Sequence, residues 1–230
     1  MPYTSAIRQT DRASNRRCLR QMPILTAAVL GAATVTFRHV ACGDDVNQSR
    51  TTYYAELYIY PIVVAGLLLY ELADSGLALH PRWFVAAACG AILWTLAEYL
   101  VHRFLYHEAP VLKDLHGMHH ARPSDLVGAP IGVSAVIFCS WFFLVARVSD
   151  VEIASGSASG LILGYVLYLT VHDAVHRWPL SEDSWLRKHR LRHLRHHRDP
   201  KPGNFGVTTS FWDHVFGTAI VPKRARPQDA

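Results

Sequence analysis

Hydrophobic residues gather in four blocks along the chain, each about as long as a membrane-spanning helix. A helix needs about 20 mostly apolar residues to cross the hydrocarbon core of a bilayer. The blocks that meet this requirement are Leu57–Leu79, Trp83–Val101, Leu126–Ala146 and Ile153–Val171. Short connections, Gly76–Arg82 and Arg147–Asp150, join the first block to the second and the third to the fourth. The pattern predicts an all-α integral membrane protein with four transmembrane helices in two hairpins.

The basic residues lie mostly outside these blocks, and their distribution predicts an orientation. The chain has a formal net charge of +5 and a pI of about 9.1. Residues 102–125 and the tail from residue 172 carry most lysines and arginines, whereas the two short connections carry one each. Two spans separate these basic regions, so they share a side, which the positive-inside rule places in the cytoplasm. Basic flanks beside membrane spans indicate anionic lipid as the partner and argue against nucleic acid.

A shorter apolar run, Met22–Phe37, follows an arginine-rich stretch near the N-terminus. If this run crossed the membrane, the arginines before it would lie on the side opposite the other basic regions. No convincing small-x-small cleavage site marks it as a signal peptide. We therefore expect an interfacial or re-entrant helix within a basic segment, residues 1–56. The membrane domain is predicted to cover residues 57–221, with a flexible tail over 222–230.

The chain contains 14 histidines, and ten of them fall into four clusters just outside the predicted spans. The clusters are His102 and His107; His116, His119 and His120; His172 and His176; and His193, His196 and His197. The spans bring all four clusters to one membrane face, where the two polar segments can form a helical cap. His39, His80, His189 and His214 stand outside the pattern.

The spacing within the clusters is typical of side chains that converge on metals. Positions i, i+3 and i+4 share a helix face, so each HxxHH triplet can present three imidazoles to one point. His172 and His176 are also i and i+4. His102 and His107 are about 140° apart on an ideal helix, so they need a distorted turn or ligate different metals.

Ten imidazoles exceed the roughly six ligands that one first-row ion accepts, so the clusters predict a dinuclear centre. Imidazole suits iron, zinc, copper and nickel. The sequence has no ExxH pair of the kind found in carboxylate-bridged di-iron bundles. The four cysteines form no CxxC pair and indicate neither a zinc site nor a disulfide framework.

The order of the clusters resembles the fatty acid hydroxylase superfamily of membrane di-iron enzymes, whose pattern is HxxxxH, HxxHH, HxxxH and HxxHH. The resemblance covers Trp94 to Thr218. Three segments look most like the fatty acid and sphingolipid 2-hydroxylases: LHGMHHARPSDLV, GYVLYLTVHDAVH and HHRDPKPGNFGVTTSFWDHVFGT.

This resemblance implies two iron ions held by the ten clustered histidines, with O2 as co-substrate and hydroxylation of a fatty-acyl C–H bond as the reaction. Zinc is an expected substitute in purified protein, because neutral imidazoles accept both metals. The family's cytochrome b5 domain would carry an HPGG stretch, and the first 50 residues hold none. The resemblance therefore implies a separate electron donor, such as a cytochrome b5 or ferredoxin system.

Several residues are candidates to support this centre. Asp173, Asp213 and Glu98 are carboxylates that could fix imidazoles through the second ring nitrogen. An apolar slot for the acyl chain could be lined by aromatic residues at the span ends. Those residues are Trp94, Tyr99, Phe104, Tyr165 and Tyr168, for which an interfacial aromatic belt is the alternative interpretation.

Two other functions share some of these features. A sterol or isoprenoid desaturase or methyl oxidase of the same superfamily would carry the same histidine pattern, and product analysis separates it from a hydroxylase. A histidine-rich metal transporter would place ligands near the bilayer midplane. Here the clusters lie at span ends, and Leu126–Ala146 contains no ionisable group. The pattern therefore favours an enzyme.

Overall fold

The chain is described by a computed structural model, in which residues 48–74, 76, 80–126, 131–199 and 203–220 are placed. The expected interfacial helix at 22–37 and the tail at 222–230 lie outside these ranges, as does His39. The described residues form helices and no strands. The elements are α3 (Arg50–Asp74), α4 (Pro81–Leu100), the π-helix η2 (Val101–Tyr106), α5 (Pro110–Ala121), α6 (Ile131–Val148), α7 (Val151–Arg177), α8 (Leu186–Arg198) and α9 (Phe211–Val215).

Within the described part of the chain, four helices are long and apolar enough to cross a membrane, as the hydrophobic pattern predicted. They are α3, α4 continued through η2, α6 and α7. The first begins seven residues before the expected Leu57, because the Ser49 hydroxyl accepts a hydrogen bond from the Thr52 backbone N–H (3.1 Å) and caps the helix. It ends at Asp74, before Gly76 turns the chain at a φ of 65°. Local capping, rather than hydropathy, sets these bounds.

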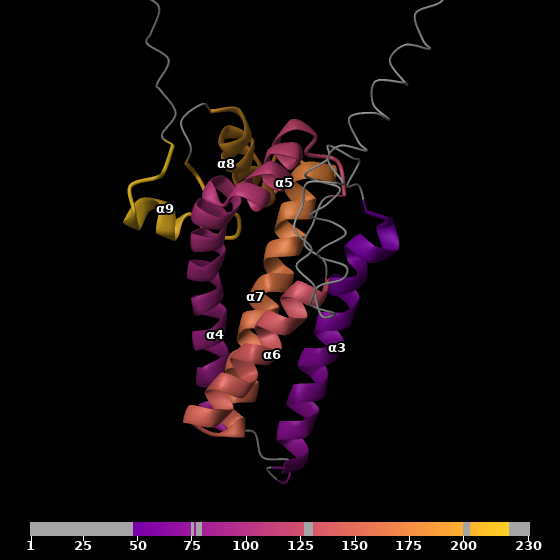
Figure 1. The fold of residues 1–230 in the computed structure, drawn as a ribbon, viewed down its shortest axis with the longest axis vertical. Helices are drawn as coiled ribbons and strands as arrows, with labels where there is room; N and C mark the ends of the chain where they lie inside the picture. The colour runs from indigo at the N-terminus through magenta and orange to yellow at the C-terminus, as the bar shows by residue number, and fades with distance from the viewer. Residues whose placement is uncertain (1–47, 75, 77–79, 127–130, 200–202, 221–230) are drawn as a thin grey trace, which may run out of the picture.

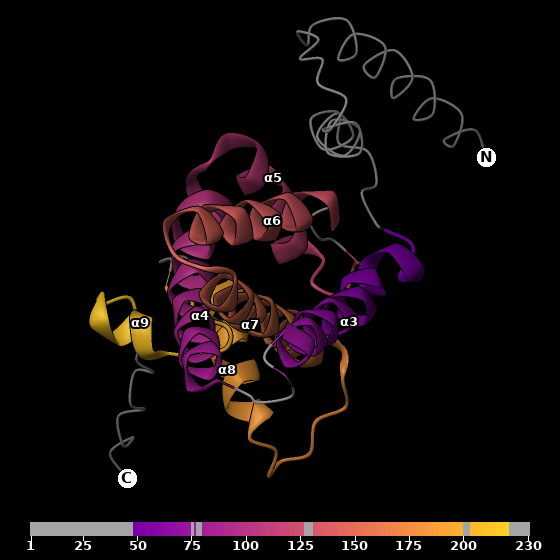
Figure 2. The ribbon, with the colours of Figure 1, turned by 90° about the horizontal axis from the view of Figure 1, so that it is seen from below.

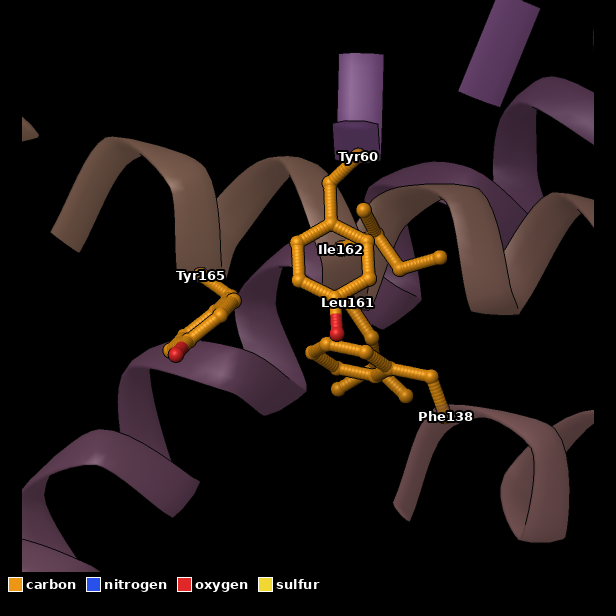
Figure 3. Packing of buried hydrophobic residues seen from close by; sticks show 5 residues of the cluster. All are labelled: Tyr60, Phe138, Leu161, Ile162 and Tyr165. Carbon is orange, nitrogen blue, oxygen red and sulfur yellow. The ribbon is translucent and has the colours of Figure 1, made fainter. Parts of the chain in front are cut away.

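Helix α7 is the centre of the bundle. Figure 2 shows it surrounded by α4, α6 and α3. In its most apolar stretch 56% of the residues are buried, against 11–22% in the other three spans. Residues from three helices meet beside it in one core cluster: Tyr60, Phe138, Leu161, Ile162 and Tyr165 (Figure 3). The outer helices therefore pack mainly on α7 and leave apolar faces for lipid.

Glycines let α4 and α7 approach closely. Gly156, Gly160 and Gly164 recur every fourth residue of α7, and such stripes permit close contact between membrane helices. A Cβ atom on Gly160 would lie 1.9 Å from the Ala87 carbonyl oxygen, and one on Gly90 would lie 2.2 Å from the Ser157 carbonyl oxygen. Neither backbone can move away without separating the two helices.

We expect Gly160→Ala to destabilise the protein by about 1–3 kcal/mol, because the added methyl group overpacks a backbone contact. The thermal unfolding midpoint in one detergent is the measurement. Gly66→Ala in α3 is the matched control, since its Cβ would meet nothing within 4 Å. An equal effect of the two substitutions would contradict the close α4–α7 packing.

The polar helices gather at one end of the bundle. Figure 1 shows α5 and α8 above the same ends of α4 and α7, with α9 beside them. Prolines open both α4 and α5 at the first helical turn, where a missing N–H costs nothing. This end carries all four histidine clusters.

Candidate metal centre

The π-helix η2 brings His102 and His107 to one side of the chain. Hydrogen bonds in a π-helix join residue i to i+5 rather than i+4, which widens the turn. The two imidazole rings stack with their centroids 5.4 Å apart. The sequence allowed a distorted turn or separate metals for this pair, and the structure shows the distorted turn.

Nine of the ten clustered histidines form two groups, in each of which the potential ligand atoms lie within 4.8 Å of one another. The first group is His102, His107, His116, His120 and His196. The second group is His119, His176, His193 and His197. The four clusters of the sequence therefore supply two groups of potential ligands.

The expectation that each HxxHH triplet points at one place is wrong. In α5, His116 and His120 belong to the first group and His119 to the second. In α8 the assignment is reversed, because His193 and His197 belong to the second group and His196 to the first. Relative to residue i, residue i+4 lies about 40° around a helix and residue i+3 about 60° the other way. In each triplet, residues i and i+4 therefore point to one group and residue i+3 points to the other.

His172 lies beside the second group but is not part of it, because its ring nitrogens are not all within 4.8 Å of the other ligand atoms. Its ring centroid lies 4.7 Å from that of His119, 4.8 Å from His176 and 4.9 Å from His193. It stands one helical turn before His176 on α7. His172 is therefore a fifth potential ligand beside the second group.

The spacing of the nitrogens fits a metal. Ligand nitrogens about 2.0–2.1 Å from an ion, at angles between octahedral and tetrahedral, are about 2.9–3.4 Å apart. In the first group the Nε2 atoms of His116 and His120 are 2.9 Å apart, and those of His102 and His116 are 3.0 Å apart. In the second group His176 and His193 are 2.8 Å apart. The buried Nε2 of His119 has no hydrogen-bond partner within the described part of the chain, as expected of a metal ligand.

The imidazoles are held in the neutral form that binds metals. Burial, strengthened by neighbouring imidazoles, lowers the pKa of His119 to about 2, of His120 to about 3 and of His197 to about 4. These values lie well below 7, so protons do not compete for the ring nitrogens at neutral pH. The site is therefore electrostatically prepared for a cation, whose charge would replace the missing protons.

An irregular segment at residues 203–207 orients three imidazoles through alternate backbone carbonyls. His196 donates from Nδ1 to the Gly203 oxygen (2.8 Å), and His102 donates to the Phe205 oxygen (2.6 Å). His189, outside both groups, donates to the Val207 oxygen (2.9 Å). A carbonyl can only accept, so Nδ1 carries the proton and Nε2 keeps its lone pair for a metal. Sequence reasoning missed these partners, because backbone carbonyls have no residue signature.

Two of the three predicted supporting carboxylates act on this segment rather than on an imidazole. The Asp213 carboxylate accepts hydrogen bonds from the backbone N–H groups of Phe205 (2.8 Å) and Gly206 (3.0 Å). Glu98 accepts from the backbone N–H groups of Val207 (2.5 Å) and Thr208 (2.9 Å). The prediction of direct contact with histidine is therefore corrected, and both acids support the ligands one step further away.

Asp173 has a different role from the one expected. Its carboxylate accepts from the Trp178 ring N–H (2.8 Å) and the Tyr54 hydroxyl (3.3 Å), and it pairs with Arg177. Arg177 in turn donates to the Tyr53 hydroxyl (2.6 Å). Asp173 therefore ties the end of α7 to the start of α3, and among the described residues it makes no hydrogen bond to a histidine.

A cavity opens onto both histidine groups from the α3 side. His102, His116, His119 and His172 form one wall. The rest of its lining is Gln48, Tyr53, Glu56, Tyr106, Leu112, Leu115, Tyr165, Tyr168 and Leu169. Only two of the five aromatics proposed for an acyl slot line it. Trp94 packs in the core cluster, Tyr99 donates toward Thr218 and Phe104 is exposed.

A third group with possible ligand atoms is Glu71, His80 and Glu152. Arg82 contacts the Glu152 carboxylate at 3.2 Å and Asp150 at 2.6 Å, which neutralises much of this acidic surface. His80 is exposed. The cluster is therefore better explained as an ion-pair network that ties the start of α4 to the start of α7. The described cysteines, Cys89 and Cys139, are free and face the bundle exterior.

Comparison with known proteins agrees with this geometry. The fatty acid hydroxylase family model matches residues 87–218, which include all ten clustered histidines. The chain belongs to the fatty acid hydroxylase family. The match begins within α4 and ends just after α9, so it contains both histidine groups and the segment that supports them.

Several relatives that match the chain are named as fatty-acyl 2-hydroxylases. The chain is 34% identical over 152 residues to a fatty acid 2-hydroxylase of Rattus norvegicus, covering 60% of this chain and 40% of that relative. It is 33% identical to a dihydroceramide fatty acyl 2-hydroxylase, FAH2, of Arabidopsis thaliana, covering 74% of each. The chain thus spans well under two thirds of the rat relative's length.

A solved structure has the same fold. It is full-length scs7p, in which only the hydroxylase domain is visible, and it superposes with a TM-score of 0.63 at 27% sequence identity. The superposition covers 74% of this chain and 67% of the other. The arrangement of helices is therefore shared with that hydroxylase domain.

Proposed function

We propose that this chain is an O2-dependent lipid hydroxylase that uses a histidine-ligated dinuclear iron centre to hydroxylate a C–H bond of a fatty-acyl chain. The observation that carries the proposal is the division of the histidines into two adjacent, neutral groups beside one cavity. The names of the relatives support the reaction and the substrate class.

The first group would supply five ligands to one iron, and the second group with His172 would supply five to the other. When bound, the two iron ions would supply the reduction of O2 and the oxidation of an unactivated C–H bond. The all-nitrogen donor set also accepts zinc, so metal analysis of purified protein must include both elements.

The protein's own residues prepare this reaction. Segment 203–207 fixes the tautomers of His102 and His196, so two ligands of the first group keep their orientation between turnovers. Leu112, Leu115 and Leu169 give the cavity an apolar wall that can hold an acyl chain and exclude water. The cavity lies on the α3 side of the histidines, within reach of the lipid-facing helices.

The four spans place the protein in a membrane, and we propose that the end carrying the histidines faces the cytoplasm, with the spans paired as two hairpins. Basic residues at that end, in α8 above all, support this orientation. The electrons for O2 reduction would then come from a separate cytoplasmic-facing donor, such as a cytochrome b5 or ferredoxin system.

Lipid mass spectrometry under ¹⁸O2 tests the function. Cells that express the wild-type chain with a competent electron donor are expected to accumulate an acyl lipid carrying one ¹⁸O atom. The variant His119→Ala, His120→Ala removes one ligand from each group and should give none. A lipid that instead loses two hydrogens would replace hydroxylation by desaturation, and identical lipids in both cultures would overturn the oxygenase proposal.

A further inference from the structure

Helix α9 carries an exposed apolar face beside the membrane spans. Phe211, Val215 and the C-cap residue Phe216 are 59%, 53% and 46% exposed. Single exposed apolar residues are ordinary on a protein surface, whereas a contiguous apolar patch marks an interaction site. Figures 1 and 2 show α9 projecting outward beside α4, on the side away from α3. The three side chains therefore form a face that an apolar partner would cover.

The opposite side of α9 is fixed to α4. The Trp212 ring N–H donates to the Thr95 hydroxyl (3.0 Å), and the Phe216 ring stacks on that of Tyr99 with the centroids 5.2 Å apart. Thr95 and Tyr99 both belong to Pro81–Tyr106, one of the four helices that can cross a membrane. Helix α9 therefore lies beside a membrane span and not beyond its end.

Exposed apolar side chains continue along this span beyond the level of α9. Leu100, Phe104 and Leu105 follow Tyr99 toward the histidine end, and each is between 38% and 45% exposed. Phe104 lies roughly 12 Å beyond Thr95 along the helix, given a rise of about 1.5 Å per residue that the π-turn shortens slightly. A bilayer whose hydrocarbon core covers these exposed side chains therefore also reaches the outer face of α9.

The inner side of α9 supports the first histidine group. Asp213 accepts hydrogen bonds from the backbone N–H groups of Phe205 and Gly206. The same segment orients His102 and His196 through its carbonyls. A helix of five residues is too short to be stable by itself, so its position depends on the contacts that both of its faces make. Whatever covers the outer face of α9 therefore also helps to hold Asp213 in place.

We propose that α9 is an interfacial anchor. Its outer face, formed by Phe211, Val215 and Phe216, inserts into the lipid leaflet on the histidine side, and this contact holds Asp213 against segment 203–207. The partner is a phospholipid bilayer, because the outer face continues the lipid-facing surface of α4. Insertion of α9 is independent of the proposed reaction, and only its consequence for the histidines as ligands rests on the proposed metal centre.

Spin labels measure the depth of α9 in the purified full chain, reconstituted in nanodiscs of phosphatidylcholine and phosphatidylglycerol. Labels are attached through Val215→Cys, Ile92→Cys and Asp183→Cys, in a background whose native cysteines are replaced by alanine. Ile92 is exposed on α4 and marks the lipid, and Asp183 is exposed between α7 and α8 and marks the water. We expect the label at position 215 to resemble the one at position 92.

The depth is read from collisions with O2, which dissolves in lipid, and with a nickel chelate, which stays in water. The label at position 215 should collide more often with O2 than with the chelate. The reverse result, which is expected at position 183, would overturn the insertion of α9. A label at position 215 that is shielded from both reagents would indicate a protein partner or a second copy of the chain, and would overturn it as well.

Hydrogen–deuterium exchange at residues 203–208 measures the coupling, in metal-free protein in the same nanodiscs. Val215→Asp places a charge on the lipid-facing side of α9, and it should speed exchange of the Phe205 and Gly206 N–H groups by at least about fivefold. Leu191→Asp is the matched control, because it makes the same kind of change at an exposed leucine of the polar helix α8. It should leave this exchange unchanged.

The buried stretch Ala154–Tyr165 of α7 is the internal reference, since slow exchange there shows that the bundle remains folded. Phe211→Asn is a milder second variant, and it decides the outcome if Val215→Asp unfolds the bundle. Unchanged exchange at residues 203–208 in the folded variants of α9, or an equal rise in Leu191→Asp, would overturn the coupling. Neither measurement uses iron or turnover, so a chain that fails to hydroxylate lipid can still uphold the anchor, and an active chain with a water-exposed α9 would refute the anchor alone.

Discussion

A His196→Ala variant is expected to lose hydroxylation by more than about 100-fold, because even the outer hydrogen-bond partners of a metal ligand are worth about 10–100-fold. His196 belongs to the first group, where its Nε2 lies 3.0 Å from that of His120 and 3.3 Å from that of His107. Its removal leaves the second group intact. Metal content should therefore fall toward one ion per chain rather than to zero.

His193→Ala should give the reciprocal result, since His193 belongs to the second group. His193 and His196 lie about one turn apart on α8. If either substitution disturbed the whole helix, both groups would lose metal to the same extent. The double variant is expected to lose both ions. Metal per protein is measured by elemental analysis after anaerobic loading with ferrous iron, alongside lipid product.

His214→Ala is the control for these substitutions. His214 is an exposed histidine on α9 whose side chain hydrogen-bonds the Ser210 carbonyl within its own turn. It should keep wild-type metal content and activity. Loss of both ions in the His196→Ala variant would contradict two independent sites, and full metal content with full activity would contradict the ligand assignment of His196.

The second large effect is expected at Asp213. This residue is fully buried, pairs with Arg192 at 3.1 Å and accepts from Phe205, Gly206 and the Thr218 hydroxyl. Removing one partner of a buried ion pair typically costs about 3–5 kcal/mol, because the other charge stays buried without compensation. Asp213→Ala also leaves two backbone N–H groups without an acceptor, so we expect a loss of stability in this range.

The Asp213→Ala effect should reach the metal as well, since Phe205 and Gly203 hold His102 and His196. Unfolding in detergent, followed with and without added iron, measures both effects. Iron should stabilise the wild type more than the variant, because the first group is no longer oriented. Asp183→Ala, at an exposed position between α7 and α8, is the control. An Asp213 variant with normal stability and normal iron response would show that segment 203–207 does not depend on this carboxylate.

The sequence by itself determined the features that depend on near neighbours. Membrane spans follow from runs of apolar side chains, because each side chain contributes its own free energy of transfer into the hydrocarbon core. The clustering of ten histidines just outside the spans is equally local, and it was sufficient to predict the family. The remaining described histidines, His80, His189 and His214, lie outside the two histidine groups.

Only the tertiary structure decided how these parts converge. The division of each HxxHH triplet between two groups requires the histidines of α5 and α8 to meet, as His120 and His196 do at 3.0 Å, which helical periodicity within one segment cannot express. The partners of His102 and His196 are backbone carbonyls, and the acids that hold their segment act at a distance from the ligands. Glu56 meets Tyr165 across 109 positions of sequence. Such contacts arise from the packing of helices, and the spacing of distant residues along the chain does not predict which of them will meet.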